Sequence, residues 1–458
     1  MVRLEGLRRG PLSYLKRYTL PLIALGMEAL FAGVFMLDPA GTGRAGPAFA
    51  LLGASFFLYL PAAALARRLP ASAGWVIGSA VLFRLTMFGV MPFASDDIYR
   101  YLWDGRVQNT GLNPYRYPPE SLELAFLRDE NYAGINHKAI RTIYPPFSQG
   151  VFRLAAALKP DLSSLKLAVL TFDLLSLAIL AALLRLRRIP AGALLIYAWN
   201  PLVVFEFAAS GHCDAIGLSL LLTGLFLAES ARPRGALLAW AGSFLAKFTP
   251  VLLLPWVFAR RTFRGAFWVF AGAILLGYLP YLGGLDPARS LAGLFEGSAR
   301  YARDWYFNAG LYALASRLIG DGIATKTVLF GGLAAFGFWL ARRVESPLPY
   351  AGVMIAATLA VSPVVHPWYA VWLVPFLCFY PLWSGVLWSG LVGLSYAVLF
   401  VYAKTGVWEI PAWVPWAEYG LVFSILAAEL IWARHPAGRT RAAEIPRPAG
   451  FELAGRSQ

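Results

Sequence analysis

Residues 165–184 read LKLAVLTFDLLSLAILAALL, a block of 20 residues with only two charged side chains, Lys166 and Asp173. A helix needs about 20 predominantly apolar residues to cross the ~30 Å hydrocarbon core of a bilayer. Basic residues follow directly, at Arg185, Arg187 and Arg188, as is common where a crossing ends. The stretch therefore predicts a transmembrane helix.

Blocks of this kind recur along the chain. Of its 458 residues, 59% are hydrophobic and 14% are charged, and the mean hydropathy is +0.59. A soluble protein of this length needs more polar residues to cover its core. Apolar spans are predicted at 18–37, 46–66, 71–91, 165–184, 191–208, 213–229, 236–258, 265–283, 323–341, 349–364, 368–381, 384–402 and 416–433. The composition predicts an all-α, polytopic transmembrane helix bundle.

The net charge of +15 comes largely from basic residues in the short connections between these spans. The clusters are Arg67–Arg68, Arg185–Arg188, Arg232–Arg234, Arg260–Arg264 and Arg342–Arg343. This is the positive-inside pattern, which reports topology, so we expect no nucleic-acid partner. It predicts a multi-pass protein of the plasma or inner membrane with both termini cytoplasmic and residues 92–164 outside.

One span does not fit a single crossing. Residues 236–258 have a basic cluster at each end, and Lys247, Pro250 and Pro255 interrupt them. A single crossing would place one cluster on the wrong face, and proline breaks a helix interior. We therefore predict a re-entrant or broken hairpin here, and about twelve crossings elsewhere.

We expect one transmembrane domain over residues 1–435, with its chemistry in the outer loop 92–164. Residues 436–458 are rich in Pro, Gly and charge, which predicts a disordered cytoplasmic tail. The two cysteines lie in separate apolar blocks and suggest neither a disulfide nor a metal site.

The outer loop opens with SDDIYRYLWDGR at residues 95–106. Ser95 is suited to cap a helix that starts at Asp96, on which Asp96, Arg100 and Trp103 would share one stripe. An amphipathic interfacial helix explains this pattern equally well. Two adjacent carboxylates near an arginine at a membrane mouth also suit a general base beside an anion-binding group.

Further polar residues are predicted on the same outer face. Glu206, His212 and Asp214 surround the start of one span, and His366, Trp368 and Tyr369 lie between two others. Each has an ordinary alternative, as an interface residue or a helix cap. Glu28, Arg84, Asp173 and Lys247 are ionisable residues that fall inside apolar spans, and they should face protein or a cavity. Arg84 suits either internal pairing, with Asp173 or Glu28, or binding of a lipid phosphate.

These motifs resemble those of a known enzyme group. Ser95–Arg106, followed by Asn113-Pro114-Tyr115 and Tyr144-Pro145-Pro146, resembles the first outer loop of GT-C glycosyltransferases, and most of all the bacterial polyprenyl-phosphate-mannose-dependent mannosyltransferases. Gly211–Asp214, Lys247–Pro250 and His366–Tyr369 also look like that group, in the same order. The similarity spans residues 84–375. Cys213 departs from the pattern, which more usually has Asn there.

The resemblance implies a cell-envelope glycosyltransferase that inverts the sugar as it moves a hexose, mannose by similarity, from a polyprenyl phosphate to an acceptor hydroxyl. The acceptor, a glycan, a lipid or a protein, stays open. Asp96 occupies the motif's leading acidic position and would be the general base, with Asp97 as the second catalytic candidate. The candidate substrate-binding residues are Arg84, Tyr99, Arg100, Trp103, Glu206, His212, Asp214, Lys247, His366, Trp368 and Tyr369.

Two other functions also fit this sequence. Broken helices and intramembrane charges also occur in transporters, so a lipid-linked-sugar flippase is the main alternative, and an oligosaccharide ligase is a second. The absence of a detectable internal repeat and the long polar outer loop argue against a transporter. Two acids could hold a divalent cation, but no complete set of oxygen ligands is visible, and no other cofactor is expected.

Overall fold

The computed structural model describes residues 11–69, 71–283, 287–320 and 322–435; the predicted disordered tail 436–458 lies outside them. Helices account for 77% of the structure, and the described residues contain no strand, only an isolated bridge between Phe307 and Val364. The prediction of an all-helical membrane protein is confirmed.

Six helical segments among the described residues are long and apolar enough to cross a membrane. They are Tyr18–Gly41, which combines most of α1 (Pro11–Leu37) with α2 (Pro39–Thr42), α3 (Ala45–Leu65), α8 (Leu162–Leu186), α18 (Gly322–Ala341), Trp383–Thr405 (from α22, Trp383–Leu391, to α23, Ala397–Thr405) and α24 (Trp413–Arg434). Several expose large apolar side chains, among them Leu25 of α1 and Ile431 of α24. Such exposure is costly in water but natural against lipid.

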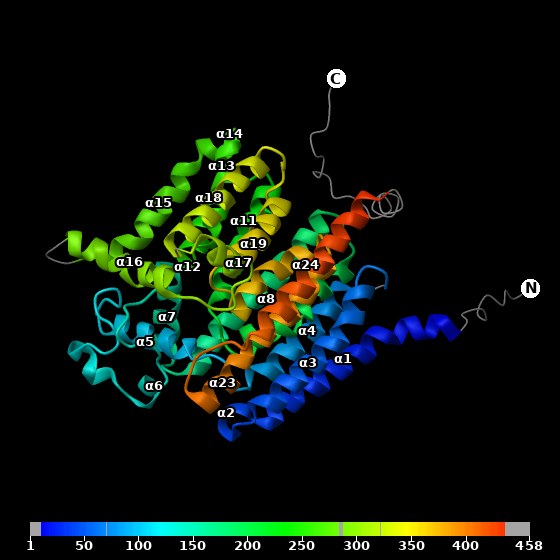
Figure 1. Ribbon diagram of the computed structural model, residues 1–458, viewed down its shortest axis with the longest axis horizontal. Helices are drawn as coiled ribbons and strands as arrows, with labels where there is room; N and C mark the ends of the chain where they lie inside the picture. The colour runs from blue at the N-terminus through cyan, green and yellow to red at the C-terminus, as the bar shows by residue number, and fades with distance from the viewer. Residues whose placement is uncertain (1–10, 70, 284–286, 321, 436–458) are drawn as a thin grey trace, which may run out of the picture.

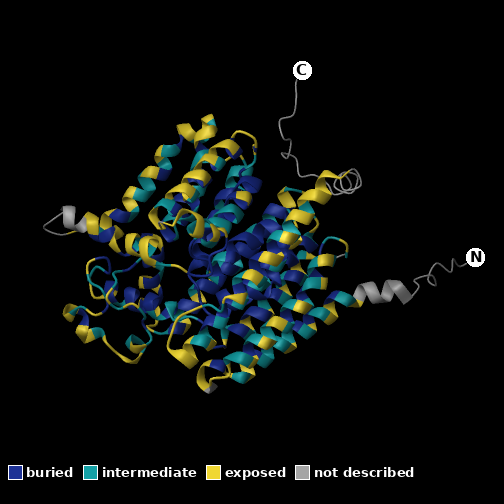
Figure 2. Cartoon of the chain, in the orientation of Figure 1, coloured by how far each residue is buried: buried dark blue, intermediate teal, exposed yellow. Residues whose placement is uncertain are grey.

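Shorter helices fill the space between the long ones. They are α4 (Ala73–Phe88), α11 (Asp214–Glu229), α12 (Pro233–Ala246), α15 (Phe267–Tyr278) and α19 (Pro347–Val361). The segments Ala191–Ala198 and Pro201–Ala209 form one apolar pair bent by 56°. Buried residues concentrate in the middle of the bundle, among them most of those in α11, α19 and the bent pair, whereas α15 lies at the edge (Figure 2). The number of crossings, about twelve by sequence, stays a prediction.

The predicted break in span 236–258 occurs at Lys247. Helix α12 ends at Ala246, Lys247 is extended, and a 3-10 turn at Thr249–Leu253 leads into α13 (Leu254–Ala259). Pro250 and Pro255 each occupy the first turn of one of these new elements, where proline is tolerated.

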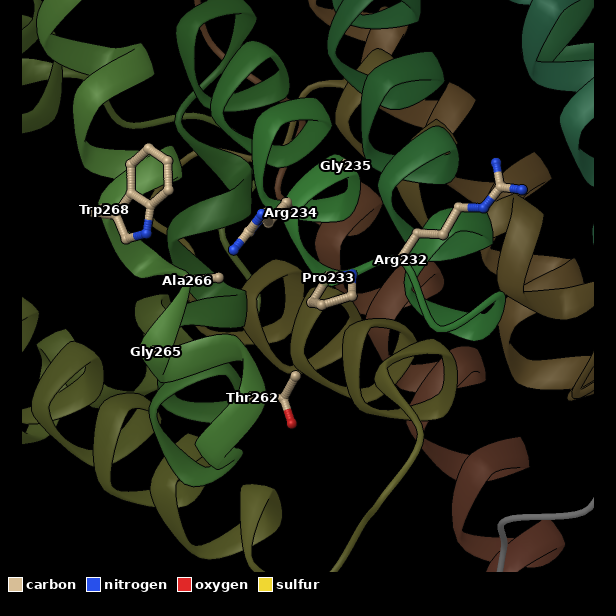
Figure 3. Close-up of a pocket in the computed structure, with 8 residues that line it drawn as sticks. All are labelled: Arg232, Pro233, Arg234, Gly235, Thr262, Gly265, Ala266 and Trp268. Carbon is tan, nitrogen blue, oxygen red and sulfur yellow. The ribbon is translucent and has the colours of Figure 1, made fainter.

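The chain then turns back beside its own start. Arg232, Pro233, Arg234 and Gly235, at the beginning of α12, line a groove of about 510 Å³ together with Thr262, Gly265, Ala266 and Trp268 (Figure 3). The two basic clusters thus lie at one end of the bundle, while Lys247 lies about 21 Å along α12, at a rise of ~1.5 Å per residue. The chain thus reverses direction within the predicted span, and its entry and exit on one membrane face stay a prediction.

Residues 92–164, the predicted outer loop, form a compact layer at the other end. Helices α5 (Asp97–Asn109) and α7 (Pro146–Leu158) pack tightly, and a Cβ at Gly105 would lie 2.2 Å from the Phe152 carbonyl oxygen. In Figure 1 this segment, in cyan, gathers at the lower left with α16 (Pro287–Asp304), away from α13 and α14 (Arg261–Gly265) at the top. The segment contains helices, and α5 begins at Asp97, one residue later than predicted; the position of these helices at the membrane interface stays a prediction.

Candidate active site

Asp96 and Asp97 lie at the start of α5. The Asp97 amide donates to Ser95 Oγ at 3.3 Å. Ser95 therefore accepts from the first residue of α5, although it lies one residue before the N-cap. Asp96 is the N-cap residue, yet its carboxylate makes no cap hydrogen bond to α5. Instead Asp96 Oδ1 accepts a hydrogen bond of 2.6 Å from Asn136 Nδ2, farther along the outer loop. Asp96 therefore faces the loop layer.

The two carboxyl groups have different surroundings. Burial raises the pKa of Asp96, while His137, Asn136 and Lys138 oppose the rise. Burial raises the pKa of Asp97 to about 7, and the neighbouring charges of Asp96 and Asp214 add to the rise while Lys247 opposes it. A pKa of about 7 lets Asp97 hold a proton near neutral pH beside the second acid.

Lys247 and Asp214 form a buried ion pair beside the acids. Lys247 Nζ lies 2.8 Å from both Asp214 oxygens, and Trp372 Nε1 donates to Asp214 Oδ1 at 2.7 Å. The ammonium also lies 4.4 Å from the centre of the Tyr369 ring. Asp214 begins α11, and Lys247 directly follows α12. The two helices pack together, so these residues lie at the same level of the bundle. The Asp214 side chain is only 1% exposed, so its charge depends on these partners.

His212 lies between two acids. Its Nε2 is 3.3 Å from Glu206 Oε2 and its Nδ1 is 3.8 Å from Asp97 Oδ2, and neither nitrogen makes a hydrogen bond within the described part of the chain. The other Glu206 oxygen accepts from the Tyr396 hydroxyl at 2.7 Å. The turn at Gly211, with φ of +73°, brings His212 into this position; a Cβ there would meet Ile98 at 2.7 Å.

Aromatic and imidazole rings form a continuous stack next to this histidine. The centroids of His212 and Trp368 are 3.9 Å apart, those of Trp368 and His366 are 4.3 Å apart, and those of His366 and Phe307 are 4.5 Å apart. The Tyr369 hydroxyl meets the Tyr301 hydroxyl at 2.7 Å. The His366–Tyr369 motif therefore joins the same cluster as His212 and Lys247.

Four other candidates have partners elsewhere. Arg84 is fully buried, pairs with Asp173 at 2.5 Å and donates to the Ala198 carbonyl, so its internal alternative is the one that the structure adopts. Arg100 pairs with Asp104 at 2.9 Å rather than with Asp96. Trp103 and Tyr99 pack in the small core of the outer layer, with Leu124 and Ile135.

Several residues of the cluster are not predicted by the sequence. They are Asn136, His137, Tyr301, Phe307, Trp372 and Tyr396. Tyr396 is 190 residues from Glu206 and Trp372 is 158 from Asp214, so no local spacing signals these contacts. Asn136 and His137 carried the only weak signal, since both are polar residues of the outer loop.

A metal site is not evident in the structure. Among the residues described, no group of three or more His, Cys, Asp or Glu side chains is arranged to hold an ion. The divalent cation considered from the sequence therefore stays a prediction.

The comparison with protein families identifies the class. Residues 32–262, half of the chain, match the family model described as the alpha-(1->6)-mannopyranosyltransferase N-terminal domain. The protein is thus a membrane glycosyltransferase of the mannosyltransferase kind, as the motifs predicted. More particularly, the chain belongs to the MptA_B family. No curated protein and no solved structure matches it significantly.

Proposed function

We propose that the protein transfers a mannosyl group from a polyprenyl-phosphate donor to an acceptor hydroxyl, with inversion, on the outer face of the membrane. The observation that carries the proposal is the convergence of Asp97, His212 and Lys247 at one end of the bundle, next to Asp96. These residues come from three separate motifs of the sequence. Their meeting places a base and the Lys247 ammonium within one cluster.

Asp96 is the proposed general base. As the acceptor oxygen bonds to the anomeric carbon, the bond from that carbon to the phosphate oxygen breaks, and the acceptor proton passes to the Asp96 carboxylate. The electron pair of the broken bond leaves with polyprenyl phosphate. Asn136 holds the Asp96 carboxylate in place from the loop side by its hydrogen bond of 2.6 Å.

The donor phosphate is proposed to bind on the side of Lys247, His212 and His366. An ammonium held by Asp214 can offer its charge to a developing phosphate anion. A carboxylate beside that anion would repel it, and a pKa of about 7 lets Asp97 carry a proton instead. In this account Asp96 is ionised and reacts, while Asp97 supports the leaving group.

The site is proposed to require both halves of the chain. The matched residues 32–262 contain Asp96, Asp97, His212 and Lys247, whereas His366 and Trp368 come from beyond them. We therefore propose one domain over residues 1–435, with the site opposite the basic end that holds Arg232 and Arg264. That arrangement places the site outside if the arginines are cytoplasmic.

Purified protein in liposomes with polyprenyl-phosphate-mannose tests the proposal. We expect loss of the donor together with mannosylation of a synthetic alkyl α-mannoside, and a β-linked donor should give an α-linked product. Movement of the lipid across the bilayer without any transfer would instead establish a flippase. Transfer of preassembled oligosaccharides, but not of mannose, would establish a ligase.

A further inference from the structure

A buried acid of the last helix is linked to the proposed site. Glu418 lies in α24 and is 0% exposed. Its Oε2 accepts from Asn308 Nδ2 at 2.9 Å, and its Oε1 accepts from Trp388 Nε1 at 2.8 Å. Glu418 lies outside the family match, and none of the sequence motifs includes it. Burying an acid costs folding stability even when two donors bind it, so these hydrogen bonds are expected to serve another purpose.

Asn308 is fixed on several sides. Its backbone has a φ of +47°, and its carbonyl accepts from the Tyr419 hydroxyl at 2.6 Å. The side-chain Nδ2 of Asn308 also donates to the Val365 carbonyl oxygen at 3.4 Å. The C-terminal helix therefore determines where this loop residue sits.

The residue before Asn308 contacts the ring stack. The Phe307 amide donates to the Pro363 carbonyl at 3.0 Å, and the Val365 amide donates to the Phe307 carbonyl at 2.8 Å. These bonds bring the buried Phe307 ring to 4.5 Å from His366, with an interplanar angle of 26°. His366 in turn is parallel to Trp368 within 5°.

We infer that Glu418 is a positioning residue for the transfer reaction, which acts by holding Asn308 so that Phe307 fixes the His366 imidazole. The inference rests on the proposed function, in which His366 contacts the donor phosphate. It assigns a role in the site to α24, the last described helix of the chain.

A reciprocal exchange tests the contact. In Asn308→Asp, two carboxylates face each other, and we expect the affinity for short-chain polyprenyl phosphate to fall roughly tenfold or more, because small misplacements of a binding group are costly. In Asn308→Asp with Glu418→Gln, the new amide donates to the new carboxylate while its oxygen still accepts from Trp388. We expect that affinity to return to within about threefold of the original protein.

The route through Phe307 is tested in a second background. When Asn308→Asp is added to Phe307→Ala, the thermal midpoint should fall. The affinity for polyprenyl phosphate should not fall below that of Phe307→Ala alone. Glu429→Gln is the matched control: Glu429 is an α24 acid that accepts from the Trp383 amide and from Ser384, and its change should leave affinity unchanged. If Asn308→Asp does not yield folded protein, Asn308→Gly, which permits the positive φ, replaces it.

Retained affinity in Asn308→Asp, no recovery in the double variant, or a full further loss in the Phe307→Ala background would overturn the inference. His366→Ala separates this failure from that of the proposed function. If His366→Ala loses phosphate affinity while Asn308→Asp keeps it, only the inference fails. If His366→Ala itself binds and transfers normally, the proposed donor site is wrong.

Discussion

The ion pair of Lys247 and Asp214 allows stability and donor binding to be separated. Lys247→Met removes the ammonium and leaves the Asp214 carboxylate, 1% exposed, with Trp372 as its remaining donor. Breaking a buried pair in this way typically costs 3–5 kcal/mol. Because the Lys247 side chain is 25% exposed, we expect the lower end, about 3 kcal/mol.

Adding Asp214→Asn should restore most of this stability. The neutral amide no longer needs a cation, and its oxygen can still accept from Trp372. Donor binding should not recover, since the phosphate has lost a charged hydrogen-bond donor worth about 2 kcal/mol, or roughly thirtyfold in affinity. Thermal unfolding in detergent and titration with polyprenyl phosphate measure the two effects. A double variant no more stable than Lys247→Met, or one that binds phosphate normally, would refute this reasoning.

Three further predictions concern the other ionisable groups. In the folded protein Asp97 keeps its proton up to about pH 7, whereas an unfolded Asp loses it near pH 4, so stability should fall as pH rises from about 4 to 7. Asp97→Asn should flatten that part of the pH–stability curve, and an unchanged slope would exclude the raised pKa. The same variant should keep measurable transfer above pH 7, where the original protein declines; pH–rate profiles decide this. Arg84→Gln should lower the thermal midpoint, because Asp173 loses its cationic partner and keeps only the Tyr197 hydroxyl, while the KM for the donor stays unchanged; a raised KM would place Arg84 at the substrate.

The apolar blocks predict the helical bundle, and the motifs predict some members of its polar cluster, among them Asp97, His212 and Lys247. Lys247 illustrates why: a charged residue followed by Pro250 cannot remain inside a continuous apolar helix, so the break could be read from the chain itself. His212 and His366 were likewise placed on the cluster's side by their positions between spans. Arg84 was left open, because the sequence offered it two partners and only the packing of α4 against α8 selects Asp173.

The remaining features depend on contacts between distant segments. Asp96 was expected inside the first turn of α5, but Asn136 holds its carboxylate away, and the helix starts one residue later. No sequence motif includes Glu418, and its partner Asn308 lies 110 residues away. A periodic pattern along one segment contains no information about such pairings.

In the proposed mechanism Asp96 takes the acceptor proton. Asp96→Asn is nearly isosteric and can keep a hydrogen bond to Asn136, so the variant should fold and bind polyprenyl phosphate as the original protein does. The most direct measurement is the rate of mannose transfer from polyprenyl-phosphate-mannose by this variant, at saturating donor and with phosphate affinity measured on the same sample. We predict a loss of at least ~100-fold in that rate, the scale expected for a general base. Transfer near the original rate with normal donor binding would contradict the account.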